Sequence, residues 1–234
     1  MLENVRILGT SHIAAQSLKE VRSSFVNDKP DILALELDRG RLVGLMSEDT
    51  ERKRVPIRQI GFKGYLFYVL GSWLQKKLGR MVGVMPGAEM KLAIKLAKKH
   101  SIKIALIDRD IRITLKRFSQ SMGWRERFNF IADIFKGFVF KKKMEEEMGL
   151  KGLDLTKVPD EELIEKLILR VKERYPGMYS SLIEERNIIM ANNILRLSLA
   201  EPDKRILVIV GAGHRRALEE ELSRASCTGF AIAG

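Results

Sequence analysis

The stretch ILALELD, residues 32–38, contains a predicted strand, Ile32–Leu37, with the pattern of a strand that is buried on both faces. Its first part is continuously apolar, and Glu36 and Asp38 follow at its end. Continuous apolar runs of this length are typical of parallel strands that helices cover on both sides. This stretch therefore favours an α/β fold.

Three further segments have the same character, namely Val5–Leu8, Ile102–Ile107 and Arg205–Val210. Apolar residues at helical spacing over Ser17–Val26 separate the first of these strands from the quoted stretch, and the same spacing over Gly87–Lys99 precedes the third strand. Alternating strands and helices predict a mainly parallel central sheet flanked by helices.

The middle of the chain has only helical patterns. We interpret residues 116–199 as a large all-helical insertion before the last core strand. The core would be formed by residues 1–115 and 200–234, so that residues 1–234 make a single domain. Such an insertion would serve as a lid, as a dimerisation arm, or as both.

Start and stop signals divide this region into helices. Asp160 has the position of an N-cap for a helix that continues through Arg174, and Pro176–Gly177 marks a turn before a long helix from Gly177 to Leu199. After the last core strand, a final helix is expected to begin at Leu218 and a small strand to lie near Phe230–Ile232.

Composition and charge exclude several classes of protein. The single cysteine, Cys227, excludes a disulfide framework and a cysteine-based zinc cluster. The net charge of +12 raises nucleic acid as a partner. However, basic and acidic residues are mixed, as where Lys141–Lys143 precede Glu145–Glu147, and no nucleic-acid-binding motif occurs. We therefore do not expect nucleic acid as a partner.

The sequence also bears on location. Glu3 and Arg6 interrupt what would be the apolar region of a signal peptide. The longest apolar stretch, Tyr65–Leu74, has about half the length that a membrane-spanning helix needs. We expect a cytoplasmic or membrane-associated protein without a transmembrane span in this chain. Tyr65–Leu74 would be a buried helix, a membrane-surface segment or a subunit contact.

Two histidines occur in the same short motif, Gly-x-x-His. The motifs are GTSH at residues 9–12 and GAGH at residues 211–214, and each directly follows a predicted strand. Because ligands bind at the carboxyl ends of parallel strands, His12 and His214 are candidates for one site.

Glu36 is the third member of this candidate site. Alternation along the strand separates its side chain from those of Leu35 and Leu37, and a buried carboxylate must be paired, ligated or protonated. Two imidazoles and one carboxylate suit a divalent metal ion. The structural alternative is a salt bridge between Glu36 and an arginine such as Arg41 or Arg186.

Further polar residues could join this site. Asp108, Arg109 and Asp110 follow the third strand, at the same edge of the predicted sheet. Glu89 stands near a helix start, where the helix dipole also favours a carboxylate. The run Glu185-Arg186-Asn187 lies in a long helix, where charged residues usually form a solvated face. Arg186 and Asn187 nevertheless adjoin the apolar side of this helix and could enter the site.

Several of these segments, in this order, resemble the TraB/PrgY family. The resemblance is carried by the following segments: ILGTSH (7–12), ELD (36–38), PGAEM (86–90), IDRD (107–110) through Thr114 and Arg117, ERN (185–187) with Met190, and GAGH (211–214). The set extends over nearly the whole chain, and its order makes it more specific than any single motif.

The resemblance implies a fold shared with the erythromycin esterase and ChaN-like groups, and a relation to Tiki proteins, which are proposed metal-dependent proteases. It implies an active site at His12, Glu36 and His214, with the Glu185–Arg186 segment as a further functional motif. Bacterial members are associated with the shutdown of peptide pheromone signals, which implies a peptide substrate. Many members continue into a membrane-embedded C-terminal half, so that membrane association through a segment absent from this chain is possible.

The resulting hypothesis is a metal-dependent peptidase that hydrolyses short or unstructured peptides. His12, Glu36 and His214 would hold Mn²⁺, Co²⁺ or Zn²⁺. The expected further roles are a general base at Glu185 or Glu89, an oxyanion-stabilising group at Arg186 or Arg109, and substrate-binding groups at Ser11, Asp108 and Asn187.

Other hypotheses remain open from sequence. The main alternative is a non-catalytic protein that binds or sequesters peptides in the same cleft. An esterase-like reaction that uses an imidazole without a metal is a third. A homodimer is expected, because the helical insertion and the apolar Tyr65–Leu74 stretch would leave hydrophobic surface that needs a partner.

Overall fold

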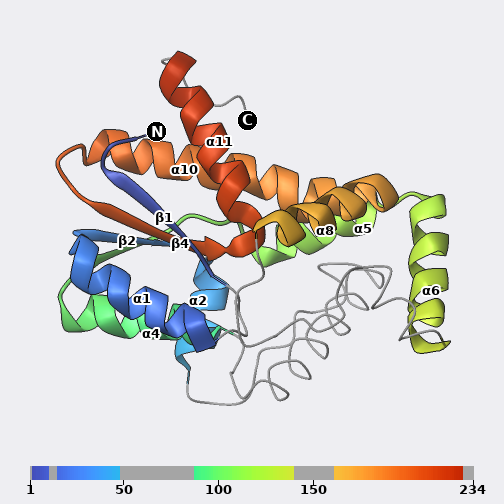
Figure 1. The fold of residues 1–234 in the computed structure, drawn as a ribbon, viewed down its shortest axis with the longest axis horizontal. Helices are drawn as coiled ribbons and strands as arrows, with labels where there is room; N and C mark the ends of the chain where they lie inside the picture. Colours follow the sequence, from blue (N-terminus) through green and yellow to red (C-terminus); the bar gives the residue numbers. More distant parts are fainter. Residues whose placement is uncertain (1, 11–14, 48–86, 140–160, 229–234) are drawn as a thin grey trace.

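The computed structural model describes residues 2–10, 15–47, 87–139 and 161–228. These residues contain one four-stranded, entirely parallel sheet, with helices on both of its faces (Figure 1). Its strands are β1 (Val5–Thr10), β2 (Ile32–Leu35), β3 (Lys103–Leu106) and β4 (Ile206–Gly211). The predicted α/β fold is confirmed, and each predicted strand bound lies within two residues of the observed one.

The strand order is β1-β4-β2-β3, so that the last strand in the sequence lies between the first two. The register places Thr10 beside Gly211, and Leu35 beside Ile209. The amide of Glu36 then donates to the carbonyl oxygen of Ile209 at 3.1 Å. The carboxyl ends of β1, β4 and β2 therefore meet at one edge, which is where open parallel sheets bind ligands.

Helices α1 (Ala15–Asp28) and α4 (Ala88–Lys99) cover one face of the sheet. Their apolar stripes pack on the strand residues that point to this side, because alternate side chains of a strand lie on the same face. The buried residues of this layer are Val21, Phe25, Leu33, Leu35, Leu37, Met90, Ala93, Ile94, Ala97, Leu207 and Ile209. The helical face predicted within residues 87–99 is thus confirmed.

The opposite face is covered by α10 (Glu185–Ala200) and α11 (Ala212–Thr228). Although α10 falls within the predicted insertion, Met190, Ala191 and Ile194 pack in one core cluster with the strands. Helix α11 begins directly after β4, so the predicted start at Leu218 was wrong. The glycines before Leu218 indicated a turn, but packing of Leu218 and Leu222 in the core outweighs the cost of about 1 kcal/mol for a glycine within the helix.

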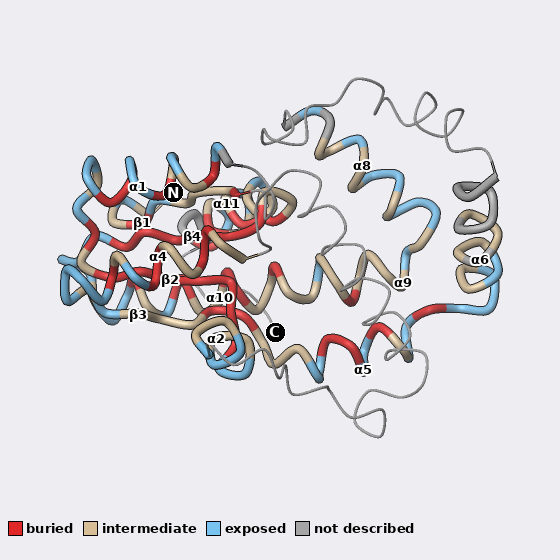
Figure 2. The backbone as a smooth tube through the Cα atoms, turned by 90° about the horizontal axis from the view of Figure 1, so that it is seen from below, coloured by how far each residue is buried: buried red, intermediate tan, exposed pale blue. Residues whose placement is uncertain are grey.

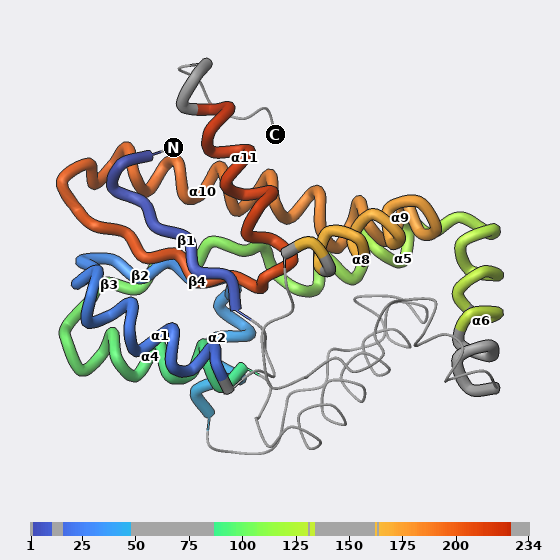
Figure 3. The backbone as a smooth tube through the Cα atoms, viewed as in Figure 1, coloured from blue at the N-terminus to red at the C-terminus, as the bar shows by residue number. Residues whose placement is uncertain are grey.

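Other helices extend from the carboxyl edge of the sheet (Figure 3). They are α2 (Arg39–Met46), α5 (Ile111–Ser121), α6 (Trp124–Val139), α8 (Glu161–Arg174), α9 (Pro176–Tyr179) and a π-helical segment, η1 (Ser180–Glu184). Because η1 joins α9 to α10 without a break in helical backbone angles, the long helix predicted from Gly177 to Leu199 is confirmed. Pro176 stands in its first turn, where a missing N–H is harmless.

Burial decreases from the sheet toward the distal helices (Figure 2). Figure 1 shows α6 far from the sheet, and its Trp124 and Phe128 side chains are largely exposed. No helix within the described ranges has both the length and the apolar character needed to cross a membrane. The predictions for Tyr65–Leu74, Asp160 and Phe230–Ile232 fall on residues outside those ranges.

Candidate active site at the carboxyl edge of the sheet

Glu36 directly follows β2 and is 6% exposed. Leu35 and Leu37 belong to the core on the other side of the strand, so alternation turns the carboxylate toward α10 and α11. Its Oε2 atom accepts a hydrogen bond of 2.6 Å from the amide of Gly211. Its Oε1 atom pairs with Arg186 and lies 3.4 Å from Nε2 of His214. The predicted convergence of Glu36 and His214 is therefore present.

His214 lies in the first turn of α11 and is 8% exposed. Its Nδ1 atom is 2.6 Å from Oδ1 of Asn187. An amide oxygen only accepts hydrogen bonds, so this contact assigns a proton to Nδ1. In the neutral ring, Nε2 then carries the lone pair and faces Nη1 of Arg186 at 3.1 Å. Asn187 thus orients the nitrogen that would bind a metal ion.

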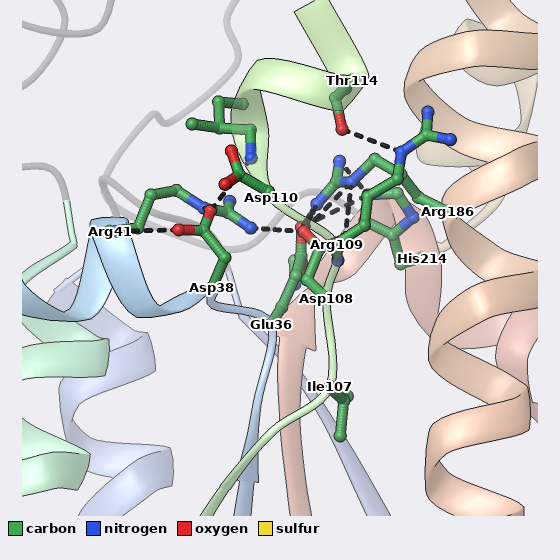
Figure 4. A network of polar contacts seen from close by, with 12 residues as sticks. Glu36, Asp38, Arg41, Ile107, Asp108, Arg109, Asp110, Thr114, Arg186 and His214 are labelled. Carbon is green, nitrogen blue, oxygen red and sulfur yellow. Dashed lines mark hydrogen bonds and ion pairs between the residues drawn. The ribbon is translucent and has the colours of Figure 1, made fainter. Parts of the chain in front are cut away.

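Arg186 connects the members of this site (Figure 4). Its Nη2 atom donates to Glu36 and, at 2.7 Å, to Oδ2 of Asp108. The Nε atom also donates to Asp108, and Nη1 donates to the carbonyl oxygen of Leu182 at 3.0 Å beside its contact with His214. A guanidinium has five N–H groups, and these contacts engage all of them. Arg186 therefore has no spare donor for an oxyanion in this arrangement.

Asp108 is the buried anion shared by two arginines, with 1% of its side chain exposed. Arg41 and Arg186 both pair with its Oδ2 atom. Burial alone would raise the pKa of Asp108, but the hydrogen bonds and charge of Arg186, together with the charge of Arg41, set it below its ordinary value. For Arg186, burial is likewise outweighed by Glu36 and Asp108, and its pKa lies above the ordinary value. Both groups are thus charged at neutral pH.

Asp38 supports the site by accepting hydrogen bonds at the starts of two helices. Its Oδ1 atom accepts from the Arg41 amide at 2.9 Å as the N-cap of α2, and its Oδ2 atom accepts from the Ile111 amide at 3.2 Å at the start of α5. The Asp38 carboxylate also pairs with Nε of Arg41 at 2.8 Å. Helix starts leave amides without intrahelical partners, so one buried carboxylate fixes both α2 and α5 at the edge of the sheet.

A second ion-pair cluster lies beside the first and is centred on Glu185. Arg109 donates to its Oε2 atom at 2.7 Å, and Arg117 donates to both of its oxygens. Arg109 also donates to Oγ1 of Thr114 at 2.9 Å and to the Ser181 carbonyl oxygen at 2.7 Å. The hydrogen bond from Arg117 is the main cause of a lowered pKa at Glu185, with burial opposing it and Arg109 adding to it. Glu185 is thus a weak base held by cations.

Three consecutive residues of α10 all contact members of the two clusters. Glu185 pairs with Arg109, Arg186 with Glu36 and Asp108, and Asn187 with His214. Successive residues of a helix are about 100° apart, which allows this division. The run is therefore part of the site and not a solvated face. The π-helical segment η1 ends immediately before it, and such segments often lie at functional sites.

Glu89 is a further buried carboxylate at the same edge, with 1% exposure in the first turn of α4. A side chain at Gly87 would meet Leu45 of α2 at 3.1 Å, which places the start of α4 against the helix that Asp38 caps. Gly87 itself has a φ of 81°, a conformation that other residues rarely adopt.

The model of one protein family matches residues 2–222 of the chain and is described as the TraB/PrgY/gumN family. The chain belongs to this family. The TraB-like region thus includes the whole described sheet and the candidate site. The resemblance inferred from the ordered motifs is confirmed.

Curated relatives extend the TraB relationship. The chain is 31% identical over 225 residues to an uncharacterized protein of Methanocaldococcus jannaschii, a match that covers 94% of this chain and 54% of the relative. It is 23% identical over 244 residues to a human TraB domain-containing protein and 24% identical over 244 residues to the mouse one, with 94% of this chain and 62% of each relative covered. The chain therefore spans between half and two thirds of the length of these TraB relatives.

The TraB-like chain brings together most of its predicted site residues. Glu36, Asp108, Arg186, Asn187 and His214 form one contact network, and Arg109 with Glu185 forms the adjoining cluster. His12 and Ser11 lie outside the described residues. Sequence reasoning missed the roles of Asp38 and of Arg41, which pairs with Asp108 and not with Glu36. Asp38, placed just before a helical segment, was the available signal for an N-cap.

The predicted metal set stays a prediction. Among described residues, no three His, Cys, Asp or Glu side chains form a group that could hold a metal ion, and the predicted set includes His12. The two described members fit such an ion chemically, because an imidazole nitrogen and a carboxylate oxygen lie 3.4 Å apart. Arg186 contacts both of these atoms, so the ion would have to share them with a guanidinium.

Proposed function

We propose that this TraB family member is a metal-dependent peptidase that acts on short or unstructured peptides. The observation that supports the proposal most directly is the meeting of two buried groups, Glu36 and His214, at the edge where a parallel sheet binds ligands. Burying a carboxylate and an imidazole together is costly and is typical of a functional site.

In this proposal His12, Glu36 and His214 would hold Mn²⁺, Co²⁺ or Zn²⁺. When bound, such an ion would supply Lewis acidity for a water molecule and for the peptide carbonyl group. Asn187 would keep Nδ1 of His214 protonated, and the Gly211 amide would hold one oxygen of Glu36. Both contacts reduce the freedom of the ligands before an ion arrives.

The general base in this proposal is Glu89. The sequence offered Glu185 or Glu89, and the two oxygens of Glu185 are engaged by Arg109 and Arg117, which lower its pKa. A base with a depressed pKa is a poor proton acceptor. Glu89 is a buried carboxylate in the first turn of α4, at the same edge of the sheet.

Cleavage of a mixture of short peptides by chelator-treated protein tests the proposal. Mn²⁺, Co²⁺ and Zn²⁺ are added back separately to the native protein and to the His12→Ala, His214→Ala and His100→Ala variants. His100, the remaining histidine, is exposed at the end of α4 and serves as the matched control. We expect metal-restored cleavage in the native protein and in His100→Ala only. Activity that survives both other substitutions would rule out this mechanism.

A non-catalytic peptide-binding protein is the second candidate. The engagement of all five Arg186 donors favours it, because Glu36 already has a cationic partner within the protein. This candidate predicts saturable peptide binding in the same experiment, with no cleavage products at any metal concentration.

A further inference from the structure

We infer that Arg186 is a resident cation of the site and competes with a divalent metal ion for Glu36 and His214. This inference concerns regulation of the site in the proposed function and rests on that proposal. Its starting point is that one guanidinium contacts both described atoms of the predicted metal set, Oε1 of Glu36 and Nε2 of His214.

The lone pair on His214 is the first part of the argument. Nδ1–H of His214 donates to Oδ1 of Asn187, so that only Nε2 is available to a metal ion. Nη1 of Arg186 lies 3.1 Å from this Nε2 atom. A donor N–H and a metal ion cannot both use one lone pair. Metal ligation by His214 therefore requires Nη1 to move away.

Charge is the second part. Glu36, Asp38 and Asp108 are all buried, and two guanidinium groups, those of Arg41 and Arg186, pair with them. With a neutral His214, three negative and two positive charges leave one net negative charge. A divalent ion would make the net charge positive while Arg186 stays in place. Without Arg186 the other four of these described side chains have two net negative charges, which suits a divalent ion.

The remaining partners of Arg186 show how its guanidinium can leave Glu36 and His214. Asp108 accepts from Nε and Nη2, so this ion pair can retain Arg186 while Nη1 moves away from His214. The π-helical segment η1 directly precedes this part of α10. Arg186 can then neutralise the site before an ion binds and remain paired afterwards. The consequence is a site that discriminates against weakly bound ions.

Metal affinity tests the competition without any peptide. Binding of Mn²⁺, Co²⁺ and Zn²⁺ to metal-stripped protein is measured by calorimetry and by equilibrium dialysis, for the native chain and for Arg186→Gln and Arg186→Lys. The matched control is Arg112→Gln, which removes a guanidinium that pairs only with Asp110 in the described chain, at the start of α5.

We expect Arg186→Gln to bind an ion at least tenfold more tightly than the native chain, and Arg112→Gln to bind within twofold of it. Metal should also raise the melting temperature of Arg186→Gln more than that of the native chain, since the ion replaces a lost cation. If Arg186→Gln does not fold, Arg186→Lys becomes the test variant, because lysine has three N–H donors on one nitrogen in place of the five, spread over a planar guanidinium, that Arg186 uses. That variant should bind at least threefold more tightly.

The other outcomes separate this inference from the proposed function. Unchanged or weaker binding by the variants, with binding by the native chain, overturns the competition and leaves the metal proposal standing. Binding by the variants alone supports the competition and contradicts the metal-dependent function, because Arg186 would then be the permanent cation. Absence of binding in every protein overturns both.

Discussion

Oδ1 of Asn187 lies 2.6 Å from Nδ1 of His214, and this contact joins the first turn of α10 to the first turn of α11. Both residues are buried. The contact fixes which ring nitrogen of His214 faces Glu36 and Arg186. The orientation of the histidine therefore depends on a neighbouring helix as well as on its own backbone.

Asn187→Ala should remove the hydrogen bond that orients the imidazole ring of His214. We expect a mixture of tautomers at His214, visible in the ¹⁵N chemical shifts of the ring, and a metal affinity lowered about 10- to 100-fold. Asn193→Ala is the control, because Asn193 lies on the same helix but donates to the Ile107 carbonyl oxygen at 2.8 Å. A single unchanged tautomer in Asn187→Ala would contradict the role of Asn187.

Asp108→Asn should weaken the fold in a pH-dependent manner. The folded-state pKa of Asp108 lies below its ordinary value of 3.8. Its ionisation therefore stabilises the fold fully above that value, and this stabilisation is lost as the pH falls through the lower folded pKa. At pH 7 we expect a loss of about 3–5 kcal/mol in the free energy of unfolding, measured with urea.

The difference between native and Asp108→Asn proteins should shrink as the pH falls below 3.8. Asp110→Asn is the control, because its pair with Arg112 is solvent-exposed and asparagine is as good an N-cap as aspartate. Its cost should be about 0–1 kcal/mol. A pH-independent difference for Asp108→Asn would contradict the assigned ionisation.

Asp38→Ala should loosen two helices together. The amides of Arg41 and Ile111 both donate to this carboxylate, so both should exchange hydrogen faster in the variant. The loss of a cap and of a buried ion pair should cost about 3 kcal/mol or more. Asp110→Ala, which removes an exposed N-cap of α5, should cost about 1 kcal/mol. Faster exchange at only one of the two amides would contradict the shared cap.

Gly177→Ala should destabilise the contact between α5 and α9. A Cβ atom at Gly177 would lie 2.2 Å from the carbonyl oxygen of Ser121, which is backbone and cannot rotate away. We expect a loss of about 1–3 kcal/mol in thermal or urea unfolding. A Cβ atom at Gly44, inside α2, would meet nothing within 4 Å, and Gly44→Ala should stabilise the fold by about 0.5–1 kcal/mol. Equal effects at the two positions would argue against this packing.

Glu89→Gln and Glu185→Gln should differ in kcat if the proposed peptidase is correct. Loss of a general base typically lowers the rate about 10²–10⁴-fold, and this is the expectation for Glu89→Gln. Glu185→Gln removes the partner of Arg109 and Arg117 and should change kcat less than tenfold. The reverse ranking would place the base at Glu185.

The strands were predictable because each is a continuous apolar run bounded by polar residues. The order of the strands was not, since the sequence of β1, β2 and β4 contains no signal that places β4 between the other two. Glu36 and His214 could be predicted as neighbours only from the general rule for strand ends. That rule does not identify the other side chains that contact Glu36 and His214.

The contacts of Arg186 show most clearly what the sequence could not predict. The sequence placed it near the apolar side of its helix and gave it two possible partners, a substrate oxyanion or Glu36. Its observed position depends on the packing of α10 against the sheet and on the η1 segment, neither of which a helical pattern specifies. Arg41 was missed for the same reason, because its partner Asp108 follows a strand far away in the sequence.

The position of β4 bears on how the protein is synthesised. Chain growth delivers β1, β2 and β3 first, and β1 has no other neighbour among the described strands until Ile206–Gly211 emerges. Glu36 likewise cannot contact the Gly211 amide or His214 until these residues have been synthesised. A nascent chain that stops before Ile206 would pair β2 with β3 but could not assemble the site. The contact between Glu36 and His214 can therefore form only after β4 and the first turn of α11 have left the ribosome.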